Sequence, residues 1–241
     1  MFFYISLGLN ILFILFAIAF VVRRGGVSYL KQKISQILNP IDEFSPANYP
    51  AYYWHKKSQF ESLPSGKNDI IMLGDSLTDE AEWSELLGGF NILNRGISGD
   101  TTDRVLYRLD SIISYPPNKI FLLIGINDLI NENRTVKDTL IKYETILDEF
   151  KRRIPQTQVF VQSLLPVNNN CERFWQDNQN IISFNQDLRK LALKYDYLYL
   201  DLFPNLVNTE GEMDKQYTHD GLHLHGQAYQ IWRDIIKQYI P

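Results

Sequence analysis

The sequence predicts a three-layer α/β fold with a five-stranded, mostly parallel sheet, preceded by an N-terminal transmembrane helix. Two observations lead to this prediction. Short apolar runs alternate with stretches of helical spacing from about residue 51 onward, and residues 1–22 carry no charged side chain. Alternating strands and helices join through right-handed crossovers, so we expect helices on both faces of a sheet of parallel strands.

Length and composition limit the classes of protein that need to be considered. The chain has 241 residues, of which 45% are hydrophobic and 22% charged, as in a single globular domain with an appendage. Its formal net charge is -4, and no basic stripe alternates with aromatic residues, so we expect no nucleic-acid partner. A single cysteine, Cys171, excludes an intrachain disulfide and a thiolate metal cluster.

The apolar segment at residues 1–22 is predicted to be a membrane anchor. About 20 helical residues at about 1.5 Å each span a hydrocarbon core of roughly 30 Å. A cleaved signal peptide and a buried soluble helix are the alternatives, but Arg23 and Arg24 stand where a signal peptide would have a small-residue cleavage site. We therefore predict an anchor at 1–22, a juxtamembrane linker at 23–50 and a catalytic or binding domain at 51–241.

Basic residues follow the apolar segment, and none precedes it. Arg23, Arg24, Lys31 and Lys33 lie on the carboxyl side, and such residues stay preferentially in the cytoplasm. The sequence therefore favours a single-pass protein with its domain on the cytoplasmic side. The alternative is that the two arginines only mark the end of the segment.

The remaining elements follow in order along the domain. Apolar runs predict buried strands at 69–73, 90–93, 119–124, 158–164 and 197–200. Helical spacing predicts helices at 52–63, 101–114, 136–153, 181–195 and 227–239. In such a sheet a ligand binds outside the carboxyl ends of the strands, so the residues just after each strand are the candidates for a site.

Polar residues and glycines follow three successive strands, in Gly74-Asp75-Ser76, in 94–102 and in 125–128. Ester hydrolysis through serine needs a hydroxyl at a sharp turn, a base, and donors aimed at the oxyanion. Ser76 offers the hydroxyl and a free backbone N–H at a helix start, whereas Gly99 and Asn127 offer further donors.

Each of these residues also has a structural interpretation. Ser76 can simply begin the next helix, Gly99 can serve turn geometry with Asp100 or Thr101 capping the following helix, and Asn127 can hold a loop. A nucleotide cradle is excluded, because the glycine loop has neither G-x-G-x-x-G spacing nor a G-K-[ST] ending.

Four histidines are available as the base, and three of them lie within residues 218–229. Asp220 precedes His223 by three residues, so a turn can bring its carboxylate to Nδ1 and leave Nε2 for the serine. A metal site made from His219, Asp220, His223 and His225 is the alternative. The fourth, His55, is predicted on the surface of a helix.

Four sequence blocks complete the pattern: GDSL from Gly74, GISGDTT around Gly99, GIND at Asn127 and DGLH from Asp220 to His223. In this order they resemble the blocks of the SGNH, or GDSL, hydrolase family, and the flanks of GISGDTT resemble its platelet-activating factor acetylhydrolase branch. The resemblance implies a flavodoxin-like fold that needs no metal or cofactor. Within it Ser76 is the nucleophile, His223 the base and Asp220 its orienter, and Gly99 and Asn127 are oxyanion donors.

The expected function is that of a membrane-anchored serine esterase acting on a small-molecule or lipid ester, with the short acyl groups that the acetylhydrolase branch implies. An α/β-hydrolase is a poorer match, because Thr78 stands where the nucleophile elbow of that fold has a second glycine. A non-catalytic module that binds a ligand or partner in the same crevice is the alternative function. The sequence leaves the physiological ester and the oligomeric state open.

Overall fold

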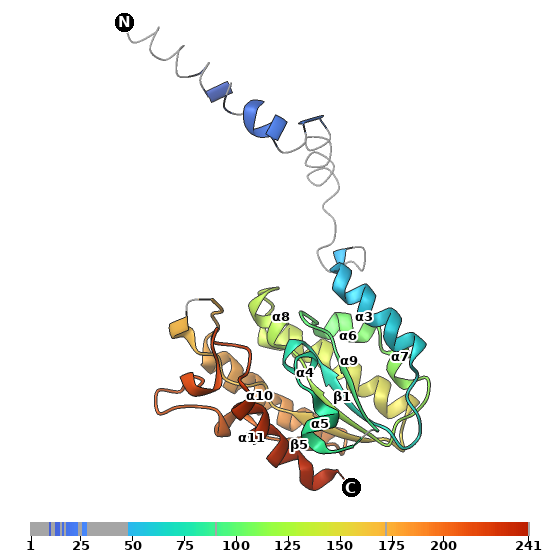
Figure 1. The fold of residues 1–241 in the computed structure, drawn as a ribbon. Coiled ribbons are helices and arrows are strands. Elements are labelled where there is room, and N and C mark those ends of the chain that lie inside the picture. The colour runs from blue at the N-terminus through green and yellow to red at the C-terminus, as the bar shows by residue number, and fades with distance from the viewer. Residues whose placement is uncertain are drawn as a thin grey trace, which may run out of the picture. The chain divides into compact units, whose positions relative to one another are not determined.

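Five parallel strands form one sheet in the spatial order β2-β1-β3-β4-β5 (Figure 1). Their bounds are β1 Ile70–Gly74, β2 Ile92–Gly96, β3 Lys119–Leu123, β4 Gln158–Gln162 and β5 Leu198–Leu200. The prediction of a five-stranded parallel sheet is confirmed. The strands β1 and β2 run farther than the apolar runs, because Gly74 and Gly96 pair with each other at the end of the ladder.

The computed structural model describes residues 10, 13–14, 16, 18–23, 26–27, 48–89, 91–171 and 173–240. The chain divides into two units, Met1–Tyr49 and Pro50–Pro241. In the first unit, residues 18–23 are helical. Most of the predicted anchor at 1–22 lies outside the described residues. Among the residues that are described, no helix is both long and apolar enough to cross a membrane.

Helices alternate with the strands of the second unit. The α-helices are α3 Ala51–Ser62, α4 Ser76–Asp79, α5 Trp83–Leu87, α6 Thr102–Tyr107, α7 Asp110–Ile113, α8 Ile126–Ile130, α9 Val136–Arg153, α10 Asn178–Lys194 and α11 Gly226–Ile236. Short 3-10 segments are η2 Asn169–Cys171, η3 Phe203–Asn205, η4 Lys215–Tyr217 and η5 Lys237–Tyr239. The sequence prediction did not include α4, α5 or α8, which are each a single turn or little more.

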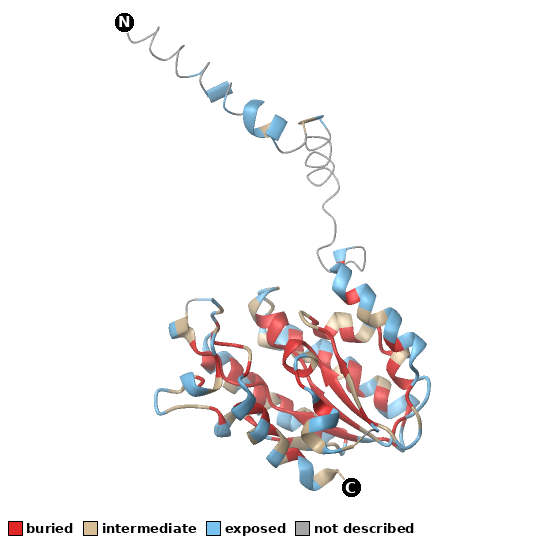
Figure 2. Ribbon diagram, in the orientation of Figure 1, coloured by how far each residue is buried: buried red, intermediate tan, exposed pale blue. Residues whose placement is uncertain are grey.

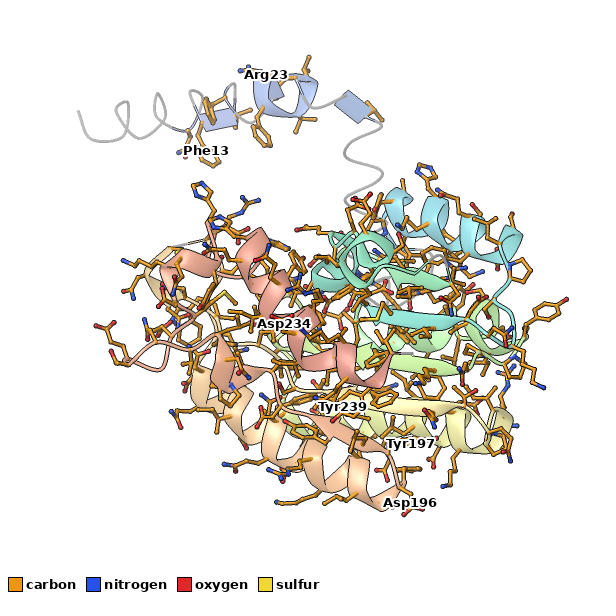
Figure 3. The ribbon with its side chains drawn as sticks, turned by 60° about the horizontal axis from the view of Figure 1, so that its bottom comes forward. Phe13, Arg23, Asp196, Tyr197, Asp234 and Tyr239 are labelled. Atoms are coloured by element: carbon orange, nitrogen blue, oxygen red, sulfur yellow. The ribbon has the colours of Figure 1, made fainter. Side chains whose placement is uncertain are left out.

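The helices form layers on the two faces of the sheet (Figure 1). On one face, α5 packs on α11 through Trp83 and Trp232, whose ring centroids lie 4.9 Å apart. On the other face, α9 packs on α10 through Tyr143 and Phe184, with centroids 6.2 Å apart. The C-terminal segment closes on the sheet where Tyr239, labelled in Figure 3, packs against Phe160 of β4 at 5.1 Å.

Two helix predictions need correction. The single helix expected at 101–114 is two helices, α6 and α7, because the backbone leaves the helical path at Arg108, whose buried side chain is held by acceptors outside the helix. The helix expected at 227–239 ends as an α-helix at Ile236 and continues as the 3-10 turn η5. Helical spacing in a sequence does not distinguish one long α-helix from a broken helix or from an α-helix that ends in a 3-10 turn, because α- and 3-10 hydrogen-bond patterns bury a similar face.

The core lies along the sheet and under the helices, as the buried residues in Figure 2 show. Every residue of β1 is buried, and the last four of β3 are buried as well. Strands covered on both faces read as continuous apolar runs, which explains why the sequence revealed them. The carboxyl ends of β1, β2 and β3 therefore form a rigid edge on which side chains can be positioned.

Candidate active site

Ser76 is the first residue of α4, directly after β1. Asp75 caps this short helix, since its Oδ1 accepts a hydrogen bond from the Leu77 N–H at 3.0 Å. Glycine is required just before it, because a Cβ on Gly74 would lie 2.3 Å from both the Leu123 carbonyl oxygen and Thr78 Oγ1. The close approach of β1, β3 and α4 fixes the turn that presents the Ser76 hydroxyl.

His223 lies beside Ser76 although 147 residues separate them in the sequence. Its Nε2 is 3.0 Å from Ser76 Oγ, and its Nδ1 is 2.8 Å from Asp220 Oδ2. The other oxygen of Asp220 accepts hydrogen bonds from the backbone N–H groups of Leu222 and His223, at 3.1 and 2.9 Å. The structure therefore joins Ser76, His223 and Asp220 in one hydrogen-bonded line.

The turn that holds Asp220 against His223 depends on Gly221. This residue has a φ of +94°, and a Cβ there would lie 2.5 Å from the Asn168 carbonyl oxygen. Its N–H donates to Thr218 Oγ1 at 2.9 Å, which closes the turn. A side chain at position 221 would therefore displace Asp220 and His223 from their positions in the turn.

Asp220 is held in its charged form. Burial raises its pKa, but the hydrogen bonds from the His223 ring and from the two backbone N–H groups outweigh that effect and lower the pKa to about 2. A carboxylate at Nδ1 fixes the imidazole tautomer that has its lone pair on Nε2, facing the serine hydroxyl.

Three N–H donors come from the segments that follow β1, β2 and β3: the backbone N–H groups of Ser76 and Gly99 and the side-chain amide of Asn127. In the described part of the chain, no hydrogen-bond acceptor pairs with the backbone N–H of Ser76 or of Gly99. Gly99 has a φ of +82°, whereas a Cβ there would meet no atom closer than 3.7 Å. Glycine is thus favoured here by backbone conformation rather than by crowding.

The side chain of Asn127 is oriented by two neighbours. Its Nδ2 donates to the Asp100 carbonyl oxygen at 2.9 Å, and its Oδ1 accepts from Asn131 Nδ2 at 2.7 Å. Asn127 is 4% exposed, and the two hydrogen bonds orient its buried amide. One N–H of Nδ2 remains for a substrate oxygen.

Two buried carboxylates support the loop between β2 and α6, and sequence analysis did not identify either role. Asp100 pairs with Arg108, whose Nε lies 2.8 Å from Oδ2, and Arg108 also donates to the carbonyl oxygens of Gly74 and Arg95. This single guanidinium therefore ties together the ends of β1 and β2 and the loop that carries Gly99. Asp100 lies within the GISGDTT block and Arg108 lies shortly after it, but only the fold shows that the two side chains pair with each other.

The second buried carboxylate is Asp128, which accepts hydrogen bonds from the Thr102 N–H at 3.0 Å and from its hydroxyl at 2.5 Å. Burial raises the pKa of Asp128 to about 6. The alternative in which Asp100 or Thr101 caps the next helix is wrong, since α6 has no side-chain cap from its N-cap residue and Asp128 binds its first N–H instead.

The other histidines lie apart from this line of residues. His219 and His225 stack on each other with centroids 6.4 Å apart, and His55 is exposed on α3. Among the described residues, no group of three or more His, Cys, Asp or Glu side chains is placed to hold a metal ion. Among the four histidines, all of which the structure describes, His223 is the one whose ring lies within hydrogen-bond distance of Ser76 Oγ.

Two further residues that the sequence did not reveal border His223. Glu80 follows Ser76 by one helical turn, and its Oε1 lies 3.8 Å from His223 Nε2. The Phe174 ring packs edge-on against the imidazole with centroids 5.5 Å apart. An acidic side chain thus lies near the nitrogen that faces Ser76, and an aromatic ring packs against the imidazole.

The chain is similar to known proteins in sequence and in fold. The sequence model of the GDSL-like lipase/acylhydrolase family matches residues 72–231. A platelet-activating factor acetylhydrolase IB subunit alpha2 from Rattus norvegicus is 30% identical over 168 residues, which cover 67% of this chain and 71% of the relative. A solved structure from Streptococcus pneumonia, assigned as a platelet activating factor, superposes with a TM-score of 0.73 at 31% identity, covering 79% of this chain and 93% of that one. A GDSL-like lipase from Bacteroides thetaiotaomicron gives a TM-score of 0.67 at 23% identity, with coverage of 78% and 96%.

Proposed function

Because the chain belongs to the GDSL-like lipase/acylhydrolase family, a family of ester hydrolases, we propose that it cleaves carboxylic esters with Ser76 as the nucleophile. In this proposal His223 is the general base and Asp220 orients it. The backbone N–H groups of Ser76 and Gly99 and the side chain of Asn127 stabilise the oxyanion. The observation that carries the proposal is the hydrogen-bonded line from Asp220 through His223 to Ser76.

The reaction follows from this geometry in two halves. Ser76 Oγ attacks the carbonyl carbon as His223 Nε2 takes the hydroxyl proton, and the carbonyl oxygen becomes an oxyanion facing the N–H donors. The C–O bond of the ester then breaks, and Nε2 returns the proton to the departing alcohol. Water repeats the sequence on the acyl-serine, which releases the carboxylic acid and restores Ser76.

Labelling of the full chain with a fluorophosphonate probe tests the nucleophile. We expect Ser76 to be labelled and the Ser76→Ala variant to lose both labelling and hydrolysis of p-nitrophenyl acetate by several orders of magnitude. The matched control is Ser84→Ala, which removes an exposed hydroxyl from α5. Hydrolysis by Ser76→Ala at the parental rate would overturn the mechanism. A folded parent that is neither labelled nor active would favour the non-catalytic binding module instead.

The proposed substrates carry short acyl groups. The support is the likeness to an acetylhydrolase subunit at 30% identity. A series of p-nitrophenyl esters from two to sixteen acyl carbons tests the preference by kcat/KM. We expect the maximum at two to four carbons, and a maximum at ten or more would contradict the proposal.

The proposed location is a membrane, with residues 1–22 as a single-pass anchor and the domain on the cytoplasmic side. Its support is the charge-free apolar sequence followed by Arg23 and Arg24. Protease added to intact spheroplasts that carry a C-terminally tagged chain tests the orientation. We expect protection of the tag, with digestion only after lysis. Digestion in spheroplasts whose cytoplasmic markers remain intact would place the domain outside.

A further inference from the structure

Helix α3 precedes the segment that matches the family, yet it packs on the part of the domain that carries the oxyanion donors. Two of its side chains, Tyr53 and Phe60, are 1% and 5% exposed. The Phe60 ring lies under the guanidinium groups of Arg95 and Arg108, 4.8 and 5.6 Å from its centroid. Figure 1 shows α3 beside α6 and α7. The helix is therefore a built-in part of this unit.

The first connection from α3 to the site passes through Asp79 at the end of α4. Its Oδ2 accepts hydrogen bonds from the backbone N–H and the hydroxyl of Ser98, at 3.0 and 2.8 Å. The same carboxylate accepts from the Tyr52 hydroxyl at 2.7 Å and pairs with Lys56 Nζ at 2.7 Å. Tyr52 and Lys56 both belong to α3, and Ser98 directly precedes Gly99.

The second connection reaches Gly99 from its other side. The Tyr53 hydroxyl donates to the Arg104 carbonyl oxygen at 3.0 Å, and Arg104 donates through Nη1 to the Gly99 carbonyl oxygen at 2.6 Å. The peptide unit that carries the Gly99 N–H is thus flanked by two peptide units, Ile97–Ser98 and Gly99–Asp100, that are held by groups that α3 contacts. Since glycine tolerates many conformations, its N–H direction depends on such external hydrogen bonds.

We infer that α3 braces the turn Ser98–Gly99 and that Asp79 is the positioning residue through which this helix sets the direction of the Gly99 N–H. The inference rests on the proposed function, because it assumes that this N–H binds the oxyanion. An oxyanion donor acts only when it is aligned in advance with the charge that develops in the transition state. A helix outside the family segment then contributes to the reaction without touching the substrate.

The ionisation of the groups involved agrees with this role. Burial raises the pKa of Asp79, but the bonds from Lys56, Tyr52 and Ser98 outweigh burial and hold the pKa below its usual value. Burial and the Asp79 carboxylate raise the pKa of Tyr52 to about 12, which agrees with a hydroxyl that donates to a carboxylate. Hydrogen bonds to an ionised carboxylate are stronger than neutral ones, which suits a fixed brace.

The test compares variants of the full chain in detergent by kcat, KM, thermal midpoint and inhibition by a trifluoromethyl ketone analogue of the transition state. Asp79→Ala removes the centre of the brace. The double variant Tyr52→Phe with Lys56→Gln removes only the two contacts that α3 makes with the Asp79 carboxylate. Asp79→Asn keeps an acceptor oxygen for Ser98. The control is Lys57→Gln on the same helix, whose carboxylate partner is Glu61 of α3 itself.

We expect kcat to fall by about tenfold to a hundredfold in Asp79→Ala with KM nearly unchanged, and the ketone to lose affinity by a similar factor. The double variant should lose threefold to tenfold by both measures, Asp79→Asn should lie between parent and alanine variant, and Lys57→Gln should match the parent. If Asp79→Ala fails to fold, the double variant decides the question. Parental kcat and ketone affinity in the double variant would overturn the brace, whereas an inactive parent would overturn the proposed function.

Discussion

The imidazole Nε2 of His223 lies 3.0 Å from Oγ of Ser76, across the edge where β1 ends. One residue comes from the start of α4, and the other comes from the loop before α11. The contact therefore depends on the whole sheet and on both helices that meet at its edge. Its consequences for activity and stability can be measured on variants of the residues around it.

His223→Ala should reduce kcat by three or more orders of magnitude, close to the loss in Ser76→Ala, because residues that act as one unit are not additive. His219→Ala and His225→Ala are the matched controls, since these two rings stack on each other, whereas the ring that contacts Ser76 Oγ is that of His223. They should retain most activity. Steady-state kinetics on p-nitrophenyl acetate measures the difference, and substantial activity in His223→Ala that a chelator removes would support the metal site instead.

Asp220→Asn should lower kcat by about a thousandfold or more, because an amide can donate to Nδ1 and favour the tautomer with its proton on Nε2. The fold should persist, since the Asn oxygen can still accept from the Leu222 and His223 N–H groups. Circular dichroism and kcat together give the result. A loss of less than tenfold would show that Asp220 does not orient the base.

Asn127→Ala should lower kcat by about a hundredfold with little change in KM, which is the expected effect of losing one oxyanion donor. Asn131→Ala removes the hydrogen bond to Asn127 Oδ1 and should give a smaller loss of the same kind. Trifluoromethyl ketone affinity should fall in parallel with kcat in both. A rise in KM at constant kcat would instead place Asn127 in substrate binding.

Asp75→Asn should change how stability depends on pH. Burial raises the pKa of Asp75 to about 8, far above the value of an unfolded aspartate. In the parent, the folded state holds the Asp75 proton more tightly than the unfolded state does. This contribution to the free energy of unfolding is present in full below about pH 4 and is lost as the pH rises through about 8. The variant has no titrating group at position 75. Its free energy of unfolding relative to the parent should therefore increase between these pH values, by on the order of a few kcal/mol.

Urea unfolding of the full chain at pH 5, 7 and 9 measures this difference. The Asn side chain keeps the acceptor for the Leu77 N–H, so the cap of α4 is retained. Asp187→Asn on the exposed face of α10 is the control and should show no such trend. A difference between Asp75→Asn and parent that stays constant from pH 5 to pH 9 would contradict the raised pKa.

Much of the domain could be predicted because the relevant information is local in the sequence. An apolar run covered on both faces indicates a buried strand, and the α9 bounds of Val136–Arg153 coincide with the stretch of helical spacing. The pairing of Asp220 with His223 was also predictable, since a turn spans three residues. The catalytic roles of the site residues and the membrane anchor stay predictions.

Other features depended on contacts between distant segments, and local patterns do not record those. Arg108 ends α6 because acceptors at the ends of two strands bind its guanidinium, although its sequence neighbourhood reads as one continuous helix. Nothing in the local sequence indicates a role for Asp79, because only the fold brings Tyr52 of α3 and Ser98 to its carboxylate. The sequence by itself determined the order of the strands and of the longer helices, and it showed the polar residues that follow the first three strands. The order and register of the strands decided which of those residues meet, because side chains far apart in the chain become neighbours only when the sheet forms.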